Sequence, residues 1–358
     1  MPVGTTAEHE DLRRTVRRWV EVHCPPSVPR ALLESPPGEP SPVWKALAEQ
    51  GWLGLHVDEE AGGEGFGLVE LAVVLEELGR ALFPGPLLPT VLTAWFVARF
   101  GGPEARAVVL PGLIDGTAPA GVHLGTGELT MGRPDGGPAL VSGTLRPVLG
   151  GTQPRWWLVP VQGQGWGVLD GDAEGVSVEP LEALDPTRAL GDLSAEGVAV
   201  HLLPRVSTEE VRDLARVMAA AEAAGAARWC LDTASDYAKV RVQFGRPIGQ
   251  FQAVKHKLAD MLVTVEQADA VAWDAAQAWS GDERESRALA AAVAGAVALE
   301  AAAGRAKTCI QILGGIGFTW EHDAHLYLRR AMATRQLLGQ AGPLRHRVTV
   351  LALAGARR

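Results

Sequence analysis

The sequence has few cysteines and fewer basic than acidic side chains, and both features exclude classes of protein. Only three of its 358 residues are cysteine, namely Cys24, Cys230 and Cys309, and no two of them form a CxxC pair. This spacing argues against a zinc site or a disulfide framework and favours a reducing compartment, the cytoplasm. The net charge of -9 argues against a nucleic-acid partner, which would require a basic surface.

Long hydrophobic segments are also scarce. The first residues, M-P-V-G-T-T-A-E-H-E-D, lack the basic stretch and apolar core of a signal peptide, so we expect none. The longest apolar run, Ala288 to Ala303, is rich in alanine and contains Glu300, whereas a membrane span needs about 20 strongly apolar residues. We therefore expect a buried helix there and no membrane span. With 47% hydrophobic residues, the chain can still fill the cores of two or three domains.

The hydrophobic pattern divides the chain into three segments. Residues 1–112 show apolar side chains at helical spacing, which predicts an N-terminal helical domain. Residues 113–205 are rich in glycine and proline and contain short apolar runs between turn signals such as Asp135-Gly136-Gly137. This texture is typical of a small antiparallel β domain. Residues 206–358 return to helical spacing and predict a C-terminal helical domain.

The C-terminal segment contains the clearest helix signals. Ser207 and Glu210 have the spacing of a capping box, and the helix that they begin reaches about Lys239. A second helix ends at about Gly281. A third, from about Glu285 to Leu313, is nearly all alanine, valine and leucine on several faces, so it is expected to be buried from more than one side. This pattern predicts a four-helix bundle.

A short loop joins the first two of these helices. Phe244-Gly245-Arg246-Pro247-Ile248-Gly249 breaks the helical period, because glycine permits unusual backbone angles and proline removes a hydrogen-bond donor. The residues around this break include Arg241, Phe244 and Gln252. Taken alone, they fit a helical hairpin with a solvated arginine as well as they fit a binding site.

Three motifs resemble the acyl-CoA dehydrogenase family. The loop and its flanks, R-x-x-F-G-x-x-I-x-x-F-Q-x-x-x-x-x-L-A-D-M, are similar to that family's signature. W-x-x-L-A-E-Q-G-W-L-G-L-H-V near the N-terminus resembles its helical domain, and Q-I-L-G-G-I-G-F from Gln311 to Phe318 resembles a second conserved segment. The resemblance covers nearly the whole chain and implies an N-terminal helical domain, a central β domain and a C-terminal four-helix bundle.

The resemblance implies an FAD cofactor and assigns residues to it. In the family the arginine and phenylalanine of the loop reach the FAD of a neighbouring chain; a guanidinium suits pyrophosphate oxygens, and an aromatic ring suits the edge of a planar cofactor. Glycines in the second segment let the backbone approach the cofactor, although a glycine pair alone would be a helix cap. The residues carried over are Arg241, Phe244, Gln252, Gln311, Gly314 and Gly315.

The family's catalytic base is missing from both of its usual positions. Members oxidise an acyl-CoA thioester to the trans-2-enoyl form: a glutamate takes the α-proton, FAD takes the β-hydride, and electron-transfer flavoprotein accepts the electrons. The two positions that hold this glutamate in different members correspond to Leu338 and Arg216. Neither side chain accepts a proton. The segment from Gly121 to Gly151 also lacks the family's Gly-Ser-Asp and W-I-T flavin-binding patterns.

These departures leave three hypotheses open. In the first, the chain is the non-catalytic subunit of a heteromeric α2β2 dehydrogenase, of the kind found among actinobacterial enzymes of steroid side-chain degradation. It would share FAD with a partner subunit that carries the glutamate. In the second, it is a homo-oligomeric dehydrogenase with an unplaced base. In the third, it is a binding protein on the same fold without flavin.

Overall fold

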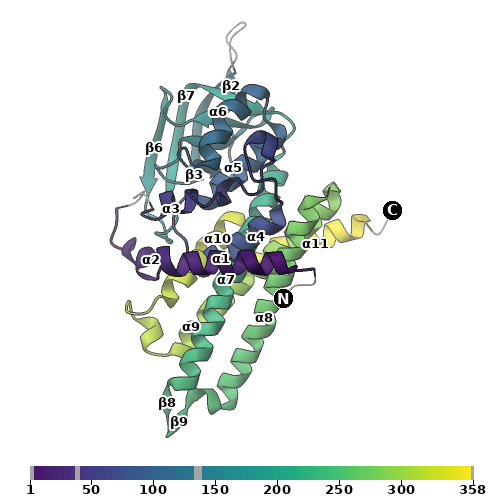
Figure 1. Ribbon diagram of the computed structural model, residues 1–358. Helices are drawn as coiled ribbons and strands as arrows, with labels where there is room; N and C mark the ends of the chain where they lie inside the picture. Colours follow the sequence, from purple (N-terminus) through teal and green to yellow (C-terminus); the bar gives the residue numbers. More distant parts are fainter. Residues whose placement is uncertain (1–3, 37–40, 133–138, 282, 356–358) are drawn as a thin grey trace. The chain divides into compact units, whose positions relative to one another are not determined.

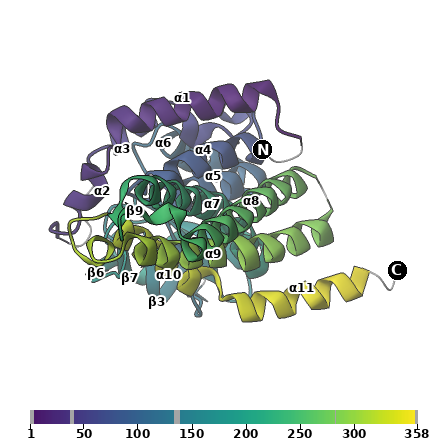
Figure 2. The ribbon, with the colours of Figure 1, turned by 90° about the horizontal axis from the view of Figure 1, so that it is seen from below.

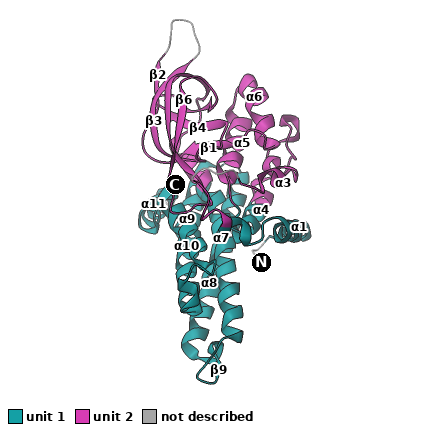
Figure 3. Cartoon of the chain, turned by 90° about the vertical axis from the view of Figure 1, so that its left-hand side faces the viewer, with its two compact units in different colours: residues 1–30, 72–83, 216–358 teal, residues 31–71, 84–215 magenta. Residues whose placement is uncertain are grey.

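The computed structural model describes residues 4–36, 41–132, 139–281 and 283–355 (Figure 1). The turn expected at Asp135-Gly136-Gly137 lies outside these ranges. The chain forms two compact units, drawn in different colours in Figure 3. Unit 1 contains residues 1–30, 72–83 and 216–358, and unit 2 contains residues 31–71 and 84–215.

The N-terminal part of the chain is helical, as expected. Its helices are α1 (Ala7–His23), α2 (Ser27–Ala31), α3 (Trp44–Ala48), α4 (Leu68–Arg80), α5 (Leu87–Phe100) and α6 (Pro103–Ile114). Helix α1 begins at a reciprocal cap in which Thr6 and His9 bond each other's backbone, and it buries Val16 and Trp19. Helix α5 is buried over most of its length, from Leu87 to Val97, and belongs to the core of unit 2.

A seven-stranded sheet makes up the rest of unit 2. Its strands are β1 (Ala120–His123), β2 (Thr130–Gly132), β3 (Leu140–Leu149), β4 (Trp156–Val161), β5 (Gly165–Asp170), β6 (Val176–Leu181) and β7 (Leu190–Leu203). Their order is β2-β3-β1-β4-β5-β7-β6, and a further pairing of β3 with β7 closes the sheet into a barrel. All pairs are antiparallel, as predicted, except for β1 with β4, which are parallel. Trp157, Leu145 and Leu193 are among the side chains that fill the barrel.

Long helices dominate unit 1. They are α7 (Thr208–Val240), α8 (Gln252–Ser280), α9 (Arg284–Leu313), α10 (Ala324–Leu338) and α11 (Ala341–Gly355). The expected capping box begins α7: Ser207 N donates to Glu210 Oε2 at 3.0 Å, and Glu210 N donates to Ser207 Oγ at 3.3 Å. Figure 2 shows α7, α8, α9 and α10 side by side, and α8, α10 and α11 all pack against α9.

Alanine and glycine allow these helices to pack closely. Helix α9 buries fifteen residues, among them Ala291, Ala294 and Ala298, which confirms that it is covered on several faces. By length and composition α9 could cross a membrane, but 56% of its apolar window is buried inside the protein, as in a core helix. Helix α4 approaches α7 backbone to backbone, because a Cβ atom added at Gly225 would lie only 1.8 Å from the carbonyl oxygen of Glu76.

Candidate functional site

The signature loop forms a tight hairpin between α7 and α8. Strands β8 (Val242–Gln243) and β9 (Arg246–Pro247) pair across Phe244 and Gly245, whose φ angles of 51° and 77° lie in the left-handed region. Ile248 N closes the loop by donating to Arg241 O at 2.8 Å. A Cβ atom at Gly249 would lie 2.9 Å from Ala238 O, so this position needs glycine. The loop therefore has one defined shape.

The hairpin holds its key side chains in solvent. Phe244 is 91% exposed although it is large and apolar, and it meets Phe251 edge-on at a centroid distance of 6.1 Å. Arg241 and Gln252 are exposed as well. Among the described residues, the Arg241 guanidinium forms no hydrogen bond or ion pair. An exposed aromatic ring and an available guanidinium in the same short loop are expected of a contact to something outside this chain.

The second predicted segment lies at the C-terminal end of α9. Gly314 caps this helix with φ 63° and ψ -134°, and its N–H donates to Ile310 O at 3.1 Å. Cβ atoms added at Gly314 or Gly315 would meet nothing within 4 Å, and Gln311 is exposed. Because α7, α8, α9 and α10 run alternately in opposite directions, this segment and the hairpin lie at the same end of the bundle (Figure 1).

Sequence reasoning missed two exposed side chains in this second segment. Phe318 is 90% exposed and Trp320 is 64% exposed. Trp320 contacts the His325 ring at 4.9 Å and lies under the Arg329 guanidinium at 5.1 Å. The signal that could have found them is the presence of large apolar residues in a glycine-rich stretch just after a helix ends.

An arginine from α2 fixes the chain between Gly315 and α10. Arg30 donates from Nη1 to Trp320 O at 2.6 Å and from Nη2 to Glu321 O at 2.9 Å, and it pairs with Asp323 at 2.6 Å. Its fork thus satisfies two backbone carbonyls and one carboxylate. Arg30 and Trp320 lie 290 residues apart in the sequence, so local sequence patterns could not predict this contact.

The two expected base positions touch each other. Arg216 on α7 donates from Nε to the backbone oxygen of Leu338, at the C-terminal end of α10, at 2.8 Å. Both residues are buried, with 8% and 3% of their surface exposed. About one helical turn from each of them, a cavity lined by Ala219 and Thr334 among others, but not by Arg216 or Leu338, measures about 20 Å³. The two sequence positions expected to hold the base therefore lie together in the fold, and they carry a guanidinium and a leucine.

A histidine at the end of β1 connects this strand to two neighbouring backbone carbonyls. His123, at the end of β1, lies with Nδ1 3.0 Å from Pro147 O and Nε2 3.2 Å from Thr126 O. Burial lowers the pKa of this histidine, so the neutral ring donates to one of the two carbonyls at a time. Arg212 donates to Gly125 O in the same loop. This loop is held by its own polar contacts, in a segment without the family's flavin-ring pattern.

Comparisons with known proteins identify the family. The model of the acyl-CoA dehydrogenase N-terminal domain matches residues 6–117, and that of the C-terminal domain matches residues 207–349. The acyl-CoA dehydrogenase IpdE2 of Mycobacterium tuberculosis is 38% identical over 92% of this chain and 93% of its own length. The chain therefore belongs to the acyl-CoA dehydrogenase family.

Further matches include a longer protein and two solved structures whose names join two proteins. The acyl-CoA dehydrogenase FadE34 of Mycobacterium tuberculosis is 45% identical over 88% of this chain, which spans only 43% of FadE34. The Tcur3481-Tcur3483 steroid ACAD matches with a TM-score of 0.89 and 32% identity, covering 98% of this chain and 99% of the other. The ChsE4-ChsE5 complex from Mycobacterium tuberculosis matches with a TM-score of 0.87 and 30% identity, covering 98% of each chain.

Proposed function

We propose that this chain is the non-catalytic subunit of a heteromeric acyl-CoA dehydrogenase and that it completes the FAD site of a partner subunit. The observation that carries the proposal is the contact between Arg216 and Leu338. A guanidinium stays protonated in proteins, and leucine has no titratable group, so neither can take the α-proton of an acyl-CoA. Removal of a general base alone lowers a rate by about 10²–10⁴.

A different register along α10 or α11 does not restore a base. No aspartate or glutamate follows Asp323 in the sequence, so no other residue of α10 or α11 supplies a carboxylate. On α7 the nearest acids are Asp213 and Glu222, both buried. The 20 Å³ cavity one turn away, lined by Ala219, Glu222 and Thr334 among others, has room for about one water molecule, far less than an acyl chain needs.

The length of α7 supports a role for the hairpin in a second chain. Val240, at the end of this helix, lies 24 residues beyond Arg216, or roughly 36 Å along the axis. Arg241, which follows, is thus remote from its own chain's base position. A cofactor that Arg241 contacts is then expected to serve the base of another subunit.

The exposed residues at the hairpin end of the bundle fit FAD. The Arg241 guanidinium suits the pyrophosphate, and Phe244 can cover an edge of the cofactor. Gln252 and Gln311 offer amides, and the open backbone at Gly314 and Gly315 permits close approach. When bound, FAD supplies a hydride acceptor. In this proposal the partner contributes the glutamate, and electron-transfer flavoprotein reoxidises the cytoplasmic assembly.

The relatives support a mixed assembly and a lipid-like substrate. ChsE4-ChsE5 is a complex of two differently named chains, and the Tcur3481-Tcur3483 protein is described as a steroid ACAD. FadE34, of which this chain spans 43%, has length for a second unit of similar size. On the basis of these relatives we also propose that the acyl-CoA substrate carries a steroid side chain.

The test is to purify the chain alone and together with a co-expressed family member that carries the glutamate. We expect the chain alone to show no turnover with an artificial electron acceptor, and the complex to contain one FAD per heterodimer. Activity should disappear when the partner's glutamate is replaced by alanine, and Leu338→Ala should leave it unchanged apart from packing effects. Robust turnover and stoichiometric FAD in the single chain would refute the proposal.

The two other hypotheses predict different results in the same experiment. A homo-oligomeric dehydrogenase with a different base would turn over alone; Asp213→Asn is the first variant to make in that case, because Asp213 lies one turn from Arg216 on α7. A binding protein without flavin would show no flavin absorbance in either preparation.

A further inference from the structure

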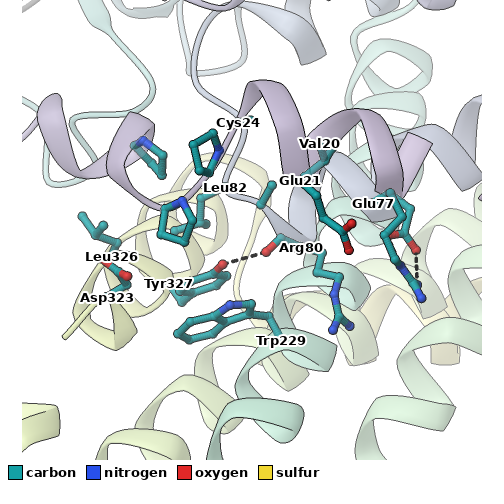
Figure 4. A pocket seen from close by; sticks show the side chains of 15 residues that line it. Val20, Glu21, Cys24, Glu77, Arg80, Leu82, Trp229, Asp323, Leu326 and Tyr327 are labelled. Atoms are coloured by element: carbon teal, nitrogen blue, oxygen red, sulfur yellow. Dashed lines mark hydrogen bonds and ion pairs between the residues drawn. The ribbon is translucent and has the colours of Figure 1, made fainter. Parts of the chain in front are cut away.

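Unit 1 contains a cavity of about 280 Å³ that the proposed dehydrogenase role does not use (Figure 4). Its walls come from α1, α2, the end of α4, α7 and α10. Trp229 lies 13 residues from Arg216 on α7, or roughly 20 Å, and 12 residues from Arg241. Tyr327 lies 11 residues from Leu338 on α10, or roughly 16 Å. The cavity is therefore separate from both the base positions and the hairpin.

The floor of the cavity is a fixed aromatic pair. Trp229 and Tyr327 stack at a centroid distance of 3.7 Å with 7° between their planes. Tyr327 is held further by its hydroxyl, which donates to Arg80 O at 2.6 Å. Figure 4 shows Tyr327 between Trp229 and the wall formed by α1 and α2. Apolar side chains complete the lining, namely Pro25, Pro26, Pro29, Leu82 and Leu326. Such walls suit a small ligand with a flat apolar body.

Most charges in the lining already have a partner. Arg17 bonds Glu77 through two nitrogens, at 2.9 and 2.6 Å. Arg80 pairs with Asp232 at 2.7 Å, and Asp323 pairs with Arg30 at 2.6 Å. These pairs cancel in charge and need no ligand.

Glu21 is the exception. Its side chain leaves α1 beside Arg80 at one end of the cavity (Figure 4). Within the described ranges its carboxylate forms no hydrogen bond and no ion pair. The cavity therefore combines an aromatic wall with the solvent-exposed carboxylate of Glu21, which has no partner in the described part of the chain, and both attract a cation. An anionic head group would be repelled by Glu21, and a neutral one would gain neither interaction.

We propose that this cavity binds a small organic ammonium compound, in which a flat apolar body of about ten heavy atoms packs over the Tyr327–Trp229 pair and the ammonium group pairs with Glu21. The site would serve a ligand other than the acyl-CoA. This proposal does not depend on the heteromeric role, because it concerns binding to side chains of this chain alone.

Three probes of similar size test the proposal on the full chain by calorimetric titration at neutral pH. They are 2-phenylethylammonium, neutral 2-phenylethanol and anionic 3-phenylpropanoate. We expect the ammonium to bind about tenfold more tightly than the alcohol, and the anion to bind least. Glu21→Gln should remove the preference for the ammonium over the alcohol. Glu174→Gln, at an exposed glutamate of unit 2, is the matched control and should retain it.

The other outcomes count against the site. Equal binding of the three probes, no binding at all, or an ammonium preference that survives Glu21→Gln would each overturn the proposal. Binding that vanishes in a co-purified assembly with a partner subunit would assign the cavity to a protein interface and would overturn it as well. None of these results bears on the turnover and flavin content that test the dehydrogenase role.

Discussion

Replacement of Gly225 by alanine tests the packing at the centre of unit 1. The new methyl group would lie 1.8 Å from Glu76 O and 2.9 Å from Arg80 N, both backbone atoms of α4. No rotamer can relieve this clash, because alanine has none and the atoms it meets belong to a helix backbone. Contacts of 3.0 Å or more require α4 and α7 to move apart by over an ångström.

The magnitude follows from two opposing effects. Alanine in place of glycine stabilises a helix interior by about 1 kcal/mol. Overpacking of a well-filled interface costs about 1–3 kcal/mol, and more where a backbone must shift. The shift would also strain the ion pair between Arg13 and Glu76, 2.7 Å apart, which joins α1 to α4. We expect Gly225→Ala to lower the free energy of unfolding by about 2–4 kcal/mol.

Gly304→Ala on α9 is the matched control. A Cβ atom there would meet nothing within 4 Å, so only the gain in helix propensity remains, and we expect stabilisation of about 0.5–1 kcal/mol. Urea unfolding followed by far-ultraviolet circular dichroism measures both variants in the same assembly. If the two variants unfold at the same urea concentration, the close approach of α4 and α7 is wrong.

Three further perturbations test the site and the network beside it. In the assembled enzyme, Arg241→Ala should raise the dissociation constant for FAD by about 10–100-fold, which is measured as loss of FAD on dialysis. Arg246→Ala, in the same hairpin, should have a smaller effect. Equal FAD retention by the two variants would contradict the assignment of Arg241. Arg30→Met should accelerate amide hydrogen exchange around Trp320 and lower FAD retention, and unchanged exchange would show that Arg30 does not fix that segment. Burial raises the pKa of Glu76 from 4.5 to about 7, so ionisation costs more in the folded protein, and the contribution of this residue to stability falls as the pH rises from 4.5 to about 7. The difference in unfolding free energy between wild type and Glu76→Gln should change by up to about 3 kcal/mol over this range, and a difference independent of pH would contradict the shift.

Local patterns in the sequence were enough to predict most elements. The order of helices, strands and helices is confirmed, and the α7 cap at Ser207 forms as its spacing indicates. The break at Gly245 does separate two long helices, because glycine and the left-handed backbone of Phe244 end the helical path there. The domain boundaries after residues 112 and 205 stay predictions.

Contacts between distant residues could not be predicted from local patterns. The parallel pairing of β1 with β4 and the short strands β1 and β2 leave little periodic signal. The bonds from Arg30 to the chain after Phe318 join residues 290 apart. The hydrogen bond from Arg216 to Leu338 connects residues 122 apart and depends on how α7 and α10 pack in the bundle. The exposure of Phe244 is likewise a property of the folded chain, since an isolated phenylalanine in a sequence predicts burial.

If this chain is the non-catalytic subunit proposed above, the two ends of α7 have separate roles. In a homomeric enzyme every chain supplies both a base and a hairpin, so loss of the base would inactivate every site. In a mixed assembly the hairpin of this chain serves its partner, and only the site near Arg216 becomes dispensable. Under that proposal Arg216 can occupy the base position without loss of activity, while Phe244 and Arg241 at the hairpin still contact a cofactor. By this reasoning Leu338→Glu alone should not create activity in this chain, because Arg216 would pair with the new carboxylate, lower its pKa and make it a weak base, and the only cavity next to it along α10 in the described part of the chain measures about 20 Å³.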